Sequence, residues 1–499
     1  MSTLKFRSGR RVAAGFKSLL AGAALTFALG AGVGQGALAA DAAAAAAPGA
    51  QGAAVTSYAD VVKRVAPAVV TVRAQRRVRA GQESPWGDNP LFEEFFGRQG
   101  RGQRPPQERR ASALGSGVIV SADGYILTNH HVVEGAEQIR IELNDGRTLD
   151  ARVVGSDEPS DLAVLKVNAS GLPTVRLGNS DETQVGDVVL AVGNPLGIGQ
   201  TVTTGIISAK GRQTGSGDGS FEDFLQTDAP INQGNSGGAL VNTSGELVGI
   251  NSQILSRTGG SIGIGFAIPS NMAAGVMEQL VKSGTVHRGQ LGVIVQKVTT
   301  DIASSLGLGG ARGVIVSQVQ PGSAAERAGL RQGDVITTLN GAPVNDPNSL
   351  RNRVASTRPG TETQLGVVRD GRETQVRVAL GEFKVERVKA EDGEGSAQEP
   401  AKRDTGKLGI GVEPLTADAA RELGLPAATR GLVVAQVDET GPAADAGLER
   451  GDVIVQANRQ AVTSAAELKT AVERTGSRPA LLLVNRGGTN LYLTVTPRQ

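Results

Sequence analysis

The sequence predicts a mainly β protein, in which an all-β barrel or sandwich is followed by two copies of a smaller module. Three observations support this prediction: short β-branched runs fill residues 115–269, glycine is abundant, and the last part of the chain repeats itself. The chain has 499 residues, of which 69 are glycine. This length is typical of three or four domains, and so much glycine favours turns between short strands over long helices.

Residues 115–269 carry the strand pattern. Their β-branched runs, separated by Gly, Asn and Asp, have the length and spacing of strands in a barrel or sandwich. Upstream, helical spacing over 61–66 ends at a proline, and 68–72 favour a strand. Downstream, apolar residues at helical spacing in 271–283 predict an amphipathic helix that closes the domain.

The C-terminal part contains an internal repeat. Residues 313–319 correspond to 431–437, and Gly333-Asp334-Val335-Ile336 corresponds to 451–454, both with an offset of 118 residues. A fixed offset without gaps predicts two copies of one module of about 90 residues. The polar stretch 385–405 is expected to join them as a linker.

Composition excludes several classes of function. The 51 basic and 49 acidic residues leave a net charge of +2, which argues against a nucleic-acid partner. There is no cysteine, so disulfides and thiolate nucleophiles are excluded. With three histidines, His130, His131 and His287, a multi-histidine metal site is not expected. No phosphate-binding loop of the Walker type occurs, and we expect neither a cofactor nor a metal.

The N-terminus has the three parts of a secretory signal. A basic head precedes an apolar run from Leu19 to about Leu29, and small residues follow up to Ala40. We therefore expect a cleaved signal peptide over 1–40 and a flexible leader over 41–56. A single membrane anchor is the alternative, although the run is short for a span. Export by the general or the twin-arginine route stays open.

Residues 75–112 look like a long exposed loop that nevertheless contains aromatic side chains. The loop is rich in Arg, Gln, Gly and Pro, yet it holds Trp86, Phe92, Phe95 and Phe96. One interpretation is an anchor onto another subunit or onto the active site. The other is a short helix that packs on its own domain, and both stay open.

Ser236 is the candidate nucleophile. It lies in Gly234-Asn235-Ser236-Gly237-Gly238, where glycine allows a turn that aims the N–H groups of Gly234 and Ser236 into one pocket. A serine hydroxyl also needs a base within hydrogen-bond reach. A glycine-rich hairpin turn with an incidental serine is the alternative interpretation of this stretch alone.

Few residues can serve as the base and its carboxylate partner. His287 lies at a domain junction, whereas His130 and His131 are expected on a strand, where adjacent side chains point opposite ways and one at most can face Ser236. Asp161 lies just ahead of an apolar strand and could be buried beside the histidine. Asp145 and Asp157, in turn-like sequence, are less attractive.

Three motifs in the order His, Asp, Ser resemble the HtrA (Do-like) serine proteases. They are Thr128-Asn129-His130-His131-Val132-Val133, Ser160-Asp161-Leu162-Ala163 and Gly234-Asn235-Ser236-Gly237-Gly238-Ala239-Leu240. The resemblance covers nearly the whole mature chain. It implies a chymotrypsin-like double β-barrel protease domain over 57–285, with PDZ domains, small β-barrels with helices, over 288–384 and 406–499.

The resemblance also implies roles for individual residues. His131 becomes the base, Asp161 the acid that orients it, Ser236 the nucleophile, and the backbone from Gly234 through Asn235 to Ser236 the oxyanion hole. Further implied positions are the substrate pocket (Ile254, Leu255), an arginine that senses peptide occupancy (Arg212), and the two carboxylate-binding loops (Leu291-Gly292-Val293 and Leu408-Gly409-Ile410). An ordinary strand start containing glycine is the alternative for each of these two loops.

The leading hypothesis is an ATP-independent serine endopeptidase that degrades unfolded or misfolded proteins in the periplasm. The PDZ domains would bind substrate C-termini or activating peptides, and the 75–112 segment would be the family's regulatory loop. The resemblance implies a homo-oligomer, a trimer or multiples of trimers. A peptide-binding chaperone with little turnover and a regulatory protease with one substrate are the alternatives. Peripheral membrane association and the role of the second PDZ domain stay open.

Overall fold

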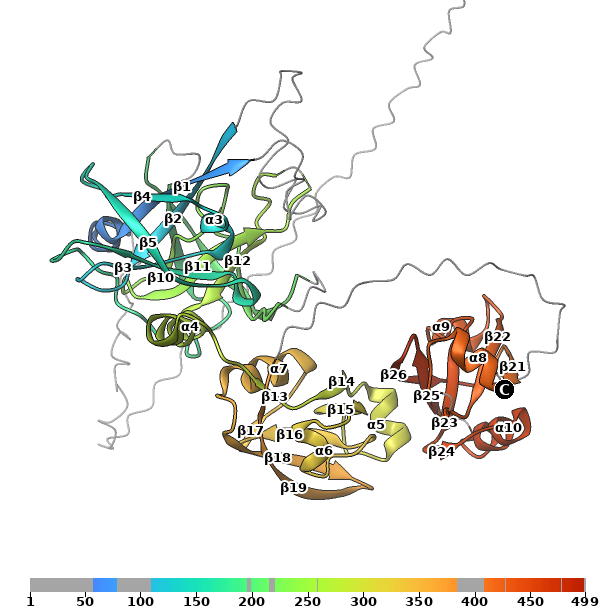
Figure 1. The fold of residues 1–499 in the computed structure, drawn as a ribbon. Coiled ribbons are helices and arrows are strands. Elements are labelled where there is room, and N and C mark those ends of the chain that lie inside the picture. The colour runs from blue at the N-terminus through green and yellow to red at the C-terminus, as the bar shows by residue number, and fades with distance from the viewer. Residues whose placement is uncertain are drawn as a thin grey trace, which may run out of the picture. The chain divides into compact units, whose positions relative to one another are not determined.

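The computed structural model describes residues 57–78, 109–194, 199–214, 220–257, 259–383, 408–426, 428–476 and 478–497. Four features expected from the sequence lie outside these residues. They are the signal peptide, the leader, the aromatic part of the 75–112 loop and the linker. The described residues fall within one compact unit that begins at Ser57, drawn as a ribbon in Figure 1.

Two closed barrels form the first part of the chain. The expected helix and strand are found as α1 (Ala59–Val65) and, after a short 3₁₀ turn η1 (Ala66–Ala68), β1 (Val69–Val78). The first barrel adds β2 (Arg109–Ile119), β3 (Tyr125–Thr128), β4 (Gln138–Glu142), β5 (Thr148–Asp157) and β6 (Leu162–Val167). The second consists of β7 (Val188–Gly193), β8 (Thr201–Arg212), β9 (Phe224–Thr227), β10 (Ala239–Asn242), β11 (Leu247–Ile254) and β12 (Gly265–Pro269).

The two barrels share one connectivity. The first closes in the order β1-β2-β3-β6-β5-β4, and the second in the order β7-β8-β9-β12-β11-β10. In each, the first strand pairs antiparallel with the fourth, β1 with β4 and β7 with β10, which closes the sheet and leaves no exposed edge. The mainly β double-barrel architecture expected from the sequence is therefore confirmed.

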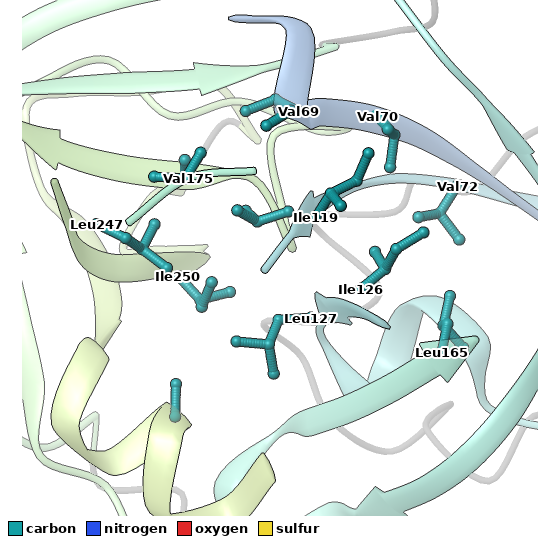
Figure 2. Packing of buried hydrophobic residues seen from close by; sticks show 14 of the residues in the cluster. Val69, Val70, Val72, Ile119, Ile126, Leu127, Leu165, Val175, Leu247 and Ile250 are labelled. Atoms are coloured by element: carbon teal, nitrogen blue, oxygen red, sulfur yellow. The ribbon is translucent and has the colours of Figure 1, made fainter. Parts of the chain in front are cut away.

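A shared apolar core supports both barrels. Figure 2 shows Ile119 and Ile126 of the first barrel packed in one cluster with Leu247 and Ile250 of β11. The second barrel also has a core of its own, which includes Ile207, Leu225 and Leu240. Because the main cluster spans both barrels, it fixes the loops at their junction relative to each other.

The expected closing helix is α4 (Ser270–Ser283), which packs against β5, β6 and β11. It buries Ala273, Val276 and Leu280 at helical spacing and ends at Gly284, whose φ of 74° suits a glycine terminator. In the described part of the chain, no helix is long and apolar enough to cross a membrane.

One expectation about local structure is wrong. The strand predicted to run through the histidines ends at Thr128, and His130–Val133 form a short helix, α3. The reason is tertiary: the carbonyl of Asp161 accepts hydrogen bonds from the Asn129 side chain (2.9 Å) and from the His130 N–H (3.2 Å). These two bonds turn the chain out of the sheet.

The repeat corresponds to two modules with the same sheet order. The first contains β13 (Gly289–Gln290), β14 (Val293–Lys297), α5 (Thr300–Leu306), β15 (Val314–Val319), α6 (Ala324–Arg327), β16 (Val335–Leu339), β17 (Ala342–Pro343), α7 (Pro347–Ser356), β18 (Glu362–Arg369), β19 (Arg372–Ala379) and β20 (Gly381–Glu382). The second contains β21 (Ile410–Pro414), α8 (Ala417–Glu422), β22 (Leu432–Val437), α9 (Pro442–Asp445), β23 (Val453–Ala457), β24 (Gln460–Ala461), α10 (Ala465–Glu473), β25 (Ala480–Arg486) and β26 (Thr489–Val495). Their sheets run β14-β15-β16-β18-β19 and β21-β22-β23-β25-β26.

Each module also contains the same buried ion pair. Asp334, 1% exposed, accepts hydrogen bonds from Arg369 at 2.7 Å, and Asp452, also 1% exposed, accepts them from Arg486 at 2.8 Å. In both modules the same guanidinium also donates to a glycine carbonyl. The Gly-Asp-Val-Ile repeat seen in the sequence is thus the turn that supplies this aspartate.

Candidate active site

Ser236 lies at the end of a glycine-rich loop that leads into β10. Its side chain is buried, with 2% of the residue exposed. Gly234 and Gly237 have φ of 97° and 81°, a region that favours glycine. A Cβ at Gly237 would lie 2.1 Å from the Ser116 carbonyl oxygen, so only glycine fits there. No group in the described part of the chain accepts a hydrogen bond from the N–H groups of Gly234 and Ser236.

His131 and Asp161 form a hydrogen-bonded pair. The ring Nδ1 of His131 lies 2.9 Å from Oδ1 and 3.0 Å from Oδ2 of Asp161, and the backbone N–H of His131 donates to Oδ1 at 3.1 Å. Asp161 follows the 3₁₀ turn η2 (Glu158–Ser160) and has a left-handed backbone, with φ of 52°. A carboxylate at Nδ1 leaves Nε2 of the neutral ring as the proton acceptor.

Ser252 of β11 links this pair to Ser236. Its hydroxyl donates to Oδ2 of Asp161 at 2.8 Å, and its backbone carbonyl accepts the hydroxyl hydrogen of Ser236, also at 2.8 Å. Ser252 of the second barrel thus connects Asp161, the partner of His131, with Ser236. The sequence prediction missed Ser252, although it lies two residues before Ile254, which was assigned to the substrate pocket. A serine flanked by asparagine and glutamine inside a strand was the available signal.

The other two histidines face elsewhere. His130 Nδ1 lies 2.6 Å from Ser156 Oγ, so its ring faces β5. His287 Nδ1 lies 2.7 Å from a carboxylate oxygen of Glu382 in the first module. The adjacent histidines of the short helix α3 thus have different partners, and His131 is the histidine that contacts Asp161.

Electrostatics favour an ionised carboxylate at Asp161. Burial alone would raise its pKa, but the charge of His131 and the hydrogen bonds from His131 and Ser252 outweigh burial and hold the pKa below the ordinary value of 3.8. A carboxylate that stays ionised stabilises the imidazolium formed when the ring takes a proton. Among the described residues, no cluster of three or more His, Asp or Glu side chains could hold a metal ion.

The residues expected to form the substrate pocket lie at the end of β11. Ile254 is 8% exposed and belongs to the core of the second barrel. Leu255 is 46% exposed, and its N–H donates to the carbonyl of Ile264 at 3.0 Å. Arg212 is the last residue of β8, where its Nε donates to the side-chain oxygen of Gln226 at 3.0 Å.

The loop Leu291-Gly292-Val293, expected to bind a carboxylate, borders a groove of about 390 Å³ between β14 and α7. Gly292 has φ of 77°, and a Cβ there would lie 2.3 Å from Ser323 Cβ. The carbonyls of Leu291 and Gly292 accept bonds from Ala325 and Gln320. In a trans peptide the N–H group points opposite to the carbonyl of the preceding residue. The N–H groups of Gly292 and Val293 therefore point away from Ala325 and Gln320.

The groove also touches the protease barrel. Gln213, the neighbour of Arg212, and Phe221 are among its lining residues. The side chain of Gln213 donates to Asn348 of α7 at 2.6 Å. The side chain of Asn348 in turn donates to the carbonyl of Glu222 at 2.9 Å. A peptide in the groove would therefore lie beside a loop of the second barrel.

The second loop repeats the geometry of the first. Gly409 has φ of 77°, and the carbonyls of Leu408 and Gly409 accept bonds from the N–H groups of Ala443 (3.1 Å) and Asp438 (2.8 Å). By the same argument the N–H groups of Gly409 and Ile410 point away from these partners. Both modules thus offer two backbone donors at the same place.

Comparison with known proteins agrees with this architecture. The model of a trypsin-like peptidase domain matches residues 115–250, and the model of a PDZ domain matches residues 289–380 and 406–496. A trypsin-like double barrel followed by two PDZ domains defines a serine endopeptidase of the trypsin-like class. Curated relatives narrow this class further.

The chain belongs to the HtrA (Do-like) family of the periplasmic serine endoproteases DegP and DegQ. It is 42% identical over 446 residues to the periplasmic pH-dependent serine endoprotease DegQ of Escherichia coli, covering 88% of this chain and 91% of the relative. It is 40% identical over 458 residues to DegP of the same organism, with the same coverage. The solved HtrA-type protease AlgW with tripeptide is 44% identical, with a TM-score of 0.54 over 66% of this chain and 98% of that one.

Proposed function

We propose that this serine endopeptidase degrades unfolded or misfolded proteins without ATP, using Ser236 as nucleophile, His131 as base and Asp161 to orient the base. The observation that carries the proposal is a chain of hydrogen bonds in which Asp161 binds the His131 ring and Ser252 binds both Asp161 and Ser236. A serine, an imidazole and a carboxylate linked in this way are the parts that acyl transfer requires.

The proposed reaction begins with the Ser236 hydroxyl leaving the Ser252 carbonyl and turning toward His131. Attack of Oγ on the substrate carbonyl carbon forms the C–O bond while Nε2 of His131 takes the hydroxyl proton. The carbonyl oxygen becomes an oxyanion, which the N–H groups of Gly234 and Ser236 stabilise. The imidazolium then protonates the leaving amine as the C–N bond breaks, and water hydrolyses the acyl-enzyme by the same steps.

Substrate choice follows from the pocket and the modules. An aliphatic wall that includes Ile254 and Leu255 favours small or branched apolar side chains at the cleaved position and disfavours charged ones. The two backbone loops, Leu291–Val293 and Leu408–Ile410, suit a C-terminal carboxylate, with the rest of the peptide added along the strand that follows. An unfolded chain satisfies both requirements, because its ends and its apolar side chains are accessible.

Location and assembly complete the proposal. The N-terminal signal pattern, together with relatives named as periplasmic proteases, supports a periplasmic enzyme. We propose a homo-oligomer, a trimer or multiples of trimers, on the family resemblance. The groove in the first module also favours a compatible second role, in which the protein holds unfolded clients.

The test compares wild type with Ser236→Ala on casein. We expect Ser236→Ala to lose casein degradation and to resist covalent labelling by an aryl phosphonate, which labels Ser236 of the wild type. Degradation at equal rates by the two proteins would contradict the assignment. If Ser236→Ala still suppresses aggregation of a denatured client, the holding role is separate from cleavage.

A further inference from the structure

A fully buried serine, Ser116, contacts the loop that contains Gly234 and Ser236, which we call the oxyanion loop. Ser116 of β2 is 0% exposed, and its hydroxyl donates to the carbonyl of Gly234 at 2.6 Å while accepting the N–H of Asn194 at 2.9 Å. Its backbone takes part as well: its N–H donates to the carbonyl of Ser236 at 2.8 Å, and its carbonyl accepts the hydroxyl of Thr128 at 2.7 Å. One residue of the first barrel therefore binds the nucleophile loop of the second twice.

These two bonds restrain the peptide planes next to those that carry the oxyanion donors. The donors are the N–H groups of Gly234 and Ser236, each of which lies in the peptide plane shared with the preceding residue. The plane between Gly234 and Asn235 separates them, and the Ser116 hydroxyl holds it through the Gly234 carbonyl. The plane after Ser236 is held by the Ser116 N–H and by the bond from the Gly237 N–H to Asn251, at 2.8 Å. The Ser236 donor thus lies between two fixed planes.

The loop needs such an attachment because its own residues do not restrict it. Gly234 and Gly237 have many accessible backbone conformations, and both take positive φ here. The glycine at position 193 lets Ser116 and Asn235 pack closely against the backbone. A Cβ at Gly193 would lie 3.1 Å from the Ser116 hydroxyl and 2.6 Å from the Asn235 side chain. An oxyanion hole is effective when its hydrogen-bond donors are preorganised, that is, held in position before the reaction.

We infer that Ser116 is a positioning residue that fixes the oxyanion loop through its hydroxyl, so that it contributes to transition-state stabilisation without touching the substrate. The inference rests on the proposed role of Ser236. It assigns to β2 of the first barrel a function in the reaction, whereas the nucleophile and the oxyanion donors all belong to the second.

The main test is Ser116→Ala, which leaves the Gly234 carbonyl and the Asn194 N–H buried without this partner. We expect kcat on a chromogenic peptide, per site titrated with the phosphonate, to fall about 10- to 100-fold with KM nearly unchanged. Affinity for a peptidyl boronate, which forms a tetrahedral adduct, should fall by a similar factor. Ser116→Cys keeps a weaker donor of similar size, and its activity should lie between the two.

The matched control is Ser270→Ala. Ser270 is 1% exposed, and its hydroxyl donates to the carbonyl of Gly178 at 2.8 Å, so the variant also loses a bond from a buried serine to a backbone carbonyl. Its melting temperature should fall as well, with kcat and boronate affinity per titrated site unchanged.

Two outcomes would overturn the inference: kcat of Ser116→Ala and Ser116→Cys within two-fold of wild type, or equal losses in the Ser270→Ala control. If Ser116→Ala does not fold, the Cys variant alone decides. Full activity of the Ser116 variants with an inactive Ser236→Ala would refute only the role of Ser116. Undiminished proteolysis by Ser236→Ala would instead refute the proposed function itself.

Discussion

Asp161 makes hydrogen bonds through both its side chain and its backbone carbonyl. Its left-handed backbone lets the carboxylate accept from the N–H of His131 and approach the ring Nδ1, while its own carbonyl accepts from Asn129 and His130. Aspartate tolerates this conformation better than most residues do. The same residue therefore orients the ring and ends the strand that precedes it.

Asp161→Asn should lower kcat by about four orders of magnitude, because an amide oxygen neither selects the ring tautomer reliably nor stabilises the imidazolium. Steady-state cleavage of a chromogenic peptide measures the loss, and KM should change little. Asp145→Asn is the control, since Asp145 lies in an exposed turn where it binds Arg147. A loss below ten-fold in Asp161→Asn would contradict the orienting role.

The lowered pKa of Asp161 also predicts how stability depends on pH. Its pKa in the folded protein lies below the ordinary value, so its contribution is fully present above about pH 4. That contribution disappears as the pH falls through the folded pKa, because both states are then protonated. The melting temperature of wild type should therefore drop more steeply below pH 4 than that of Asp161→Asn. Parallel curves would contradict the depressed pKa.

Each PDZ module contains an ion pair with a buried aspartate that connects two of its elements. In the first, the guanidinium of Arg369 at the end of β18 binds Asp334, which precedes β16, and so ties the β18–β19 hairpin to this turn. The hydrogen bond with Asp334 raises the pKa of Arg369, and burial only partly opposes this. Removal of the arginine would leave the buried carboxylate of Asp334 without its counter-ion.

Arg369→Ala should destabilise the first module by about 2–3 kcal/mol, since Asp334 would stay buried without its partner. The control is Arg377→Ala in the same sheet, whose contact with Glu362 is long (3.8 Å) and exposed, and should change stability by about 0.5 kcal/mol or less. Hydrogen exchange of the full chain over residues 333–339 and 362–369 measures both. Equal protection in the two variants would show that burial does not matter here.

On the scale of the whole molecule, two duplications are visible, and they differ in kind. The PDZ modules share sheet order and also residues, because the Gly-Asp turn and the buried arginine recur. The barrels share strand order alone. The backbone geometry of the loops at Gly292 and Gly409 therefore recurs, whereas the proposed catalytic residues are divided, His131 and Asp161 in one barrel and Ser236 in the other.

A peptide with a free C-terminal carboxylate should accelerate casein degradation if the modules recruit chain ends. The same peptide as its C-terminal amide should not, because it lacks the charge that the loop N–H groups would bind. Light scattering under both conditions reports any change in assembly. A chain ending before residue 406 keeps the first groove and should still respond. Equal stimulation by acid and amide would contradict carboxylate recognition.

By itself, the sequence determined the class of fold, the repeat and the candidates for catalysis. Alternating β-branched runs, a constant offset and the scarcity of histidine are local properties, and they needed no coordinates. The helix at His130–Val133 was not predictable in this way, because bonds to Asp161, about thirty positions later, turn the chain there.

Only the tertiary structure decided which residues hold Ser236 and its loop in position. Ser252 and Ser116 contact Ser236 or its loop from β11 and β2. Their partners lie far along the chain, and the strand registers of two closed barrels bring them within hydrogen-bond distance. Hydrogen bonds are directional and short-ranged, so such roles depend on three-dimensional closure, which no local pattern contains.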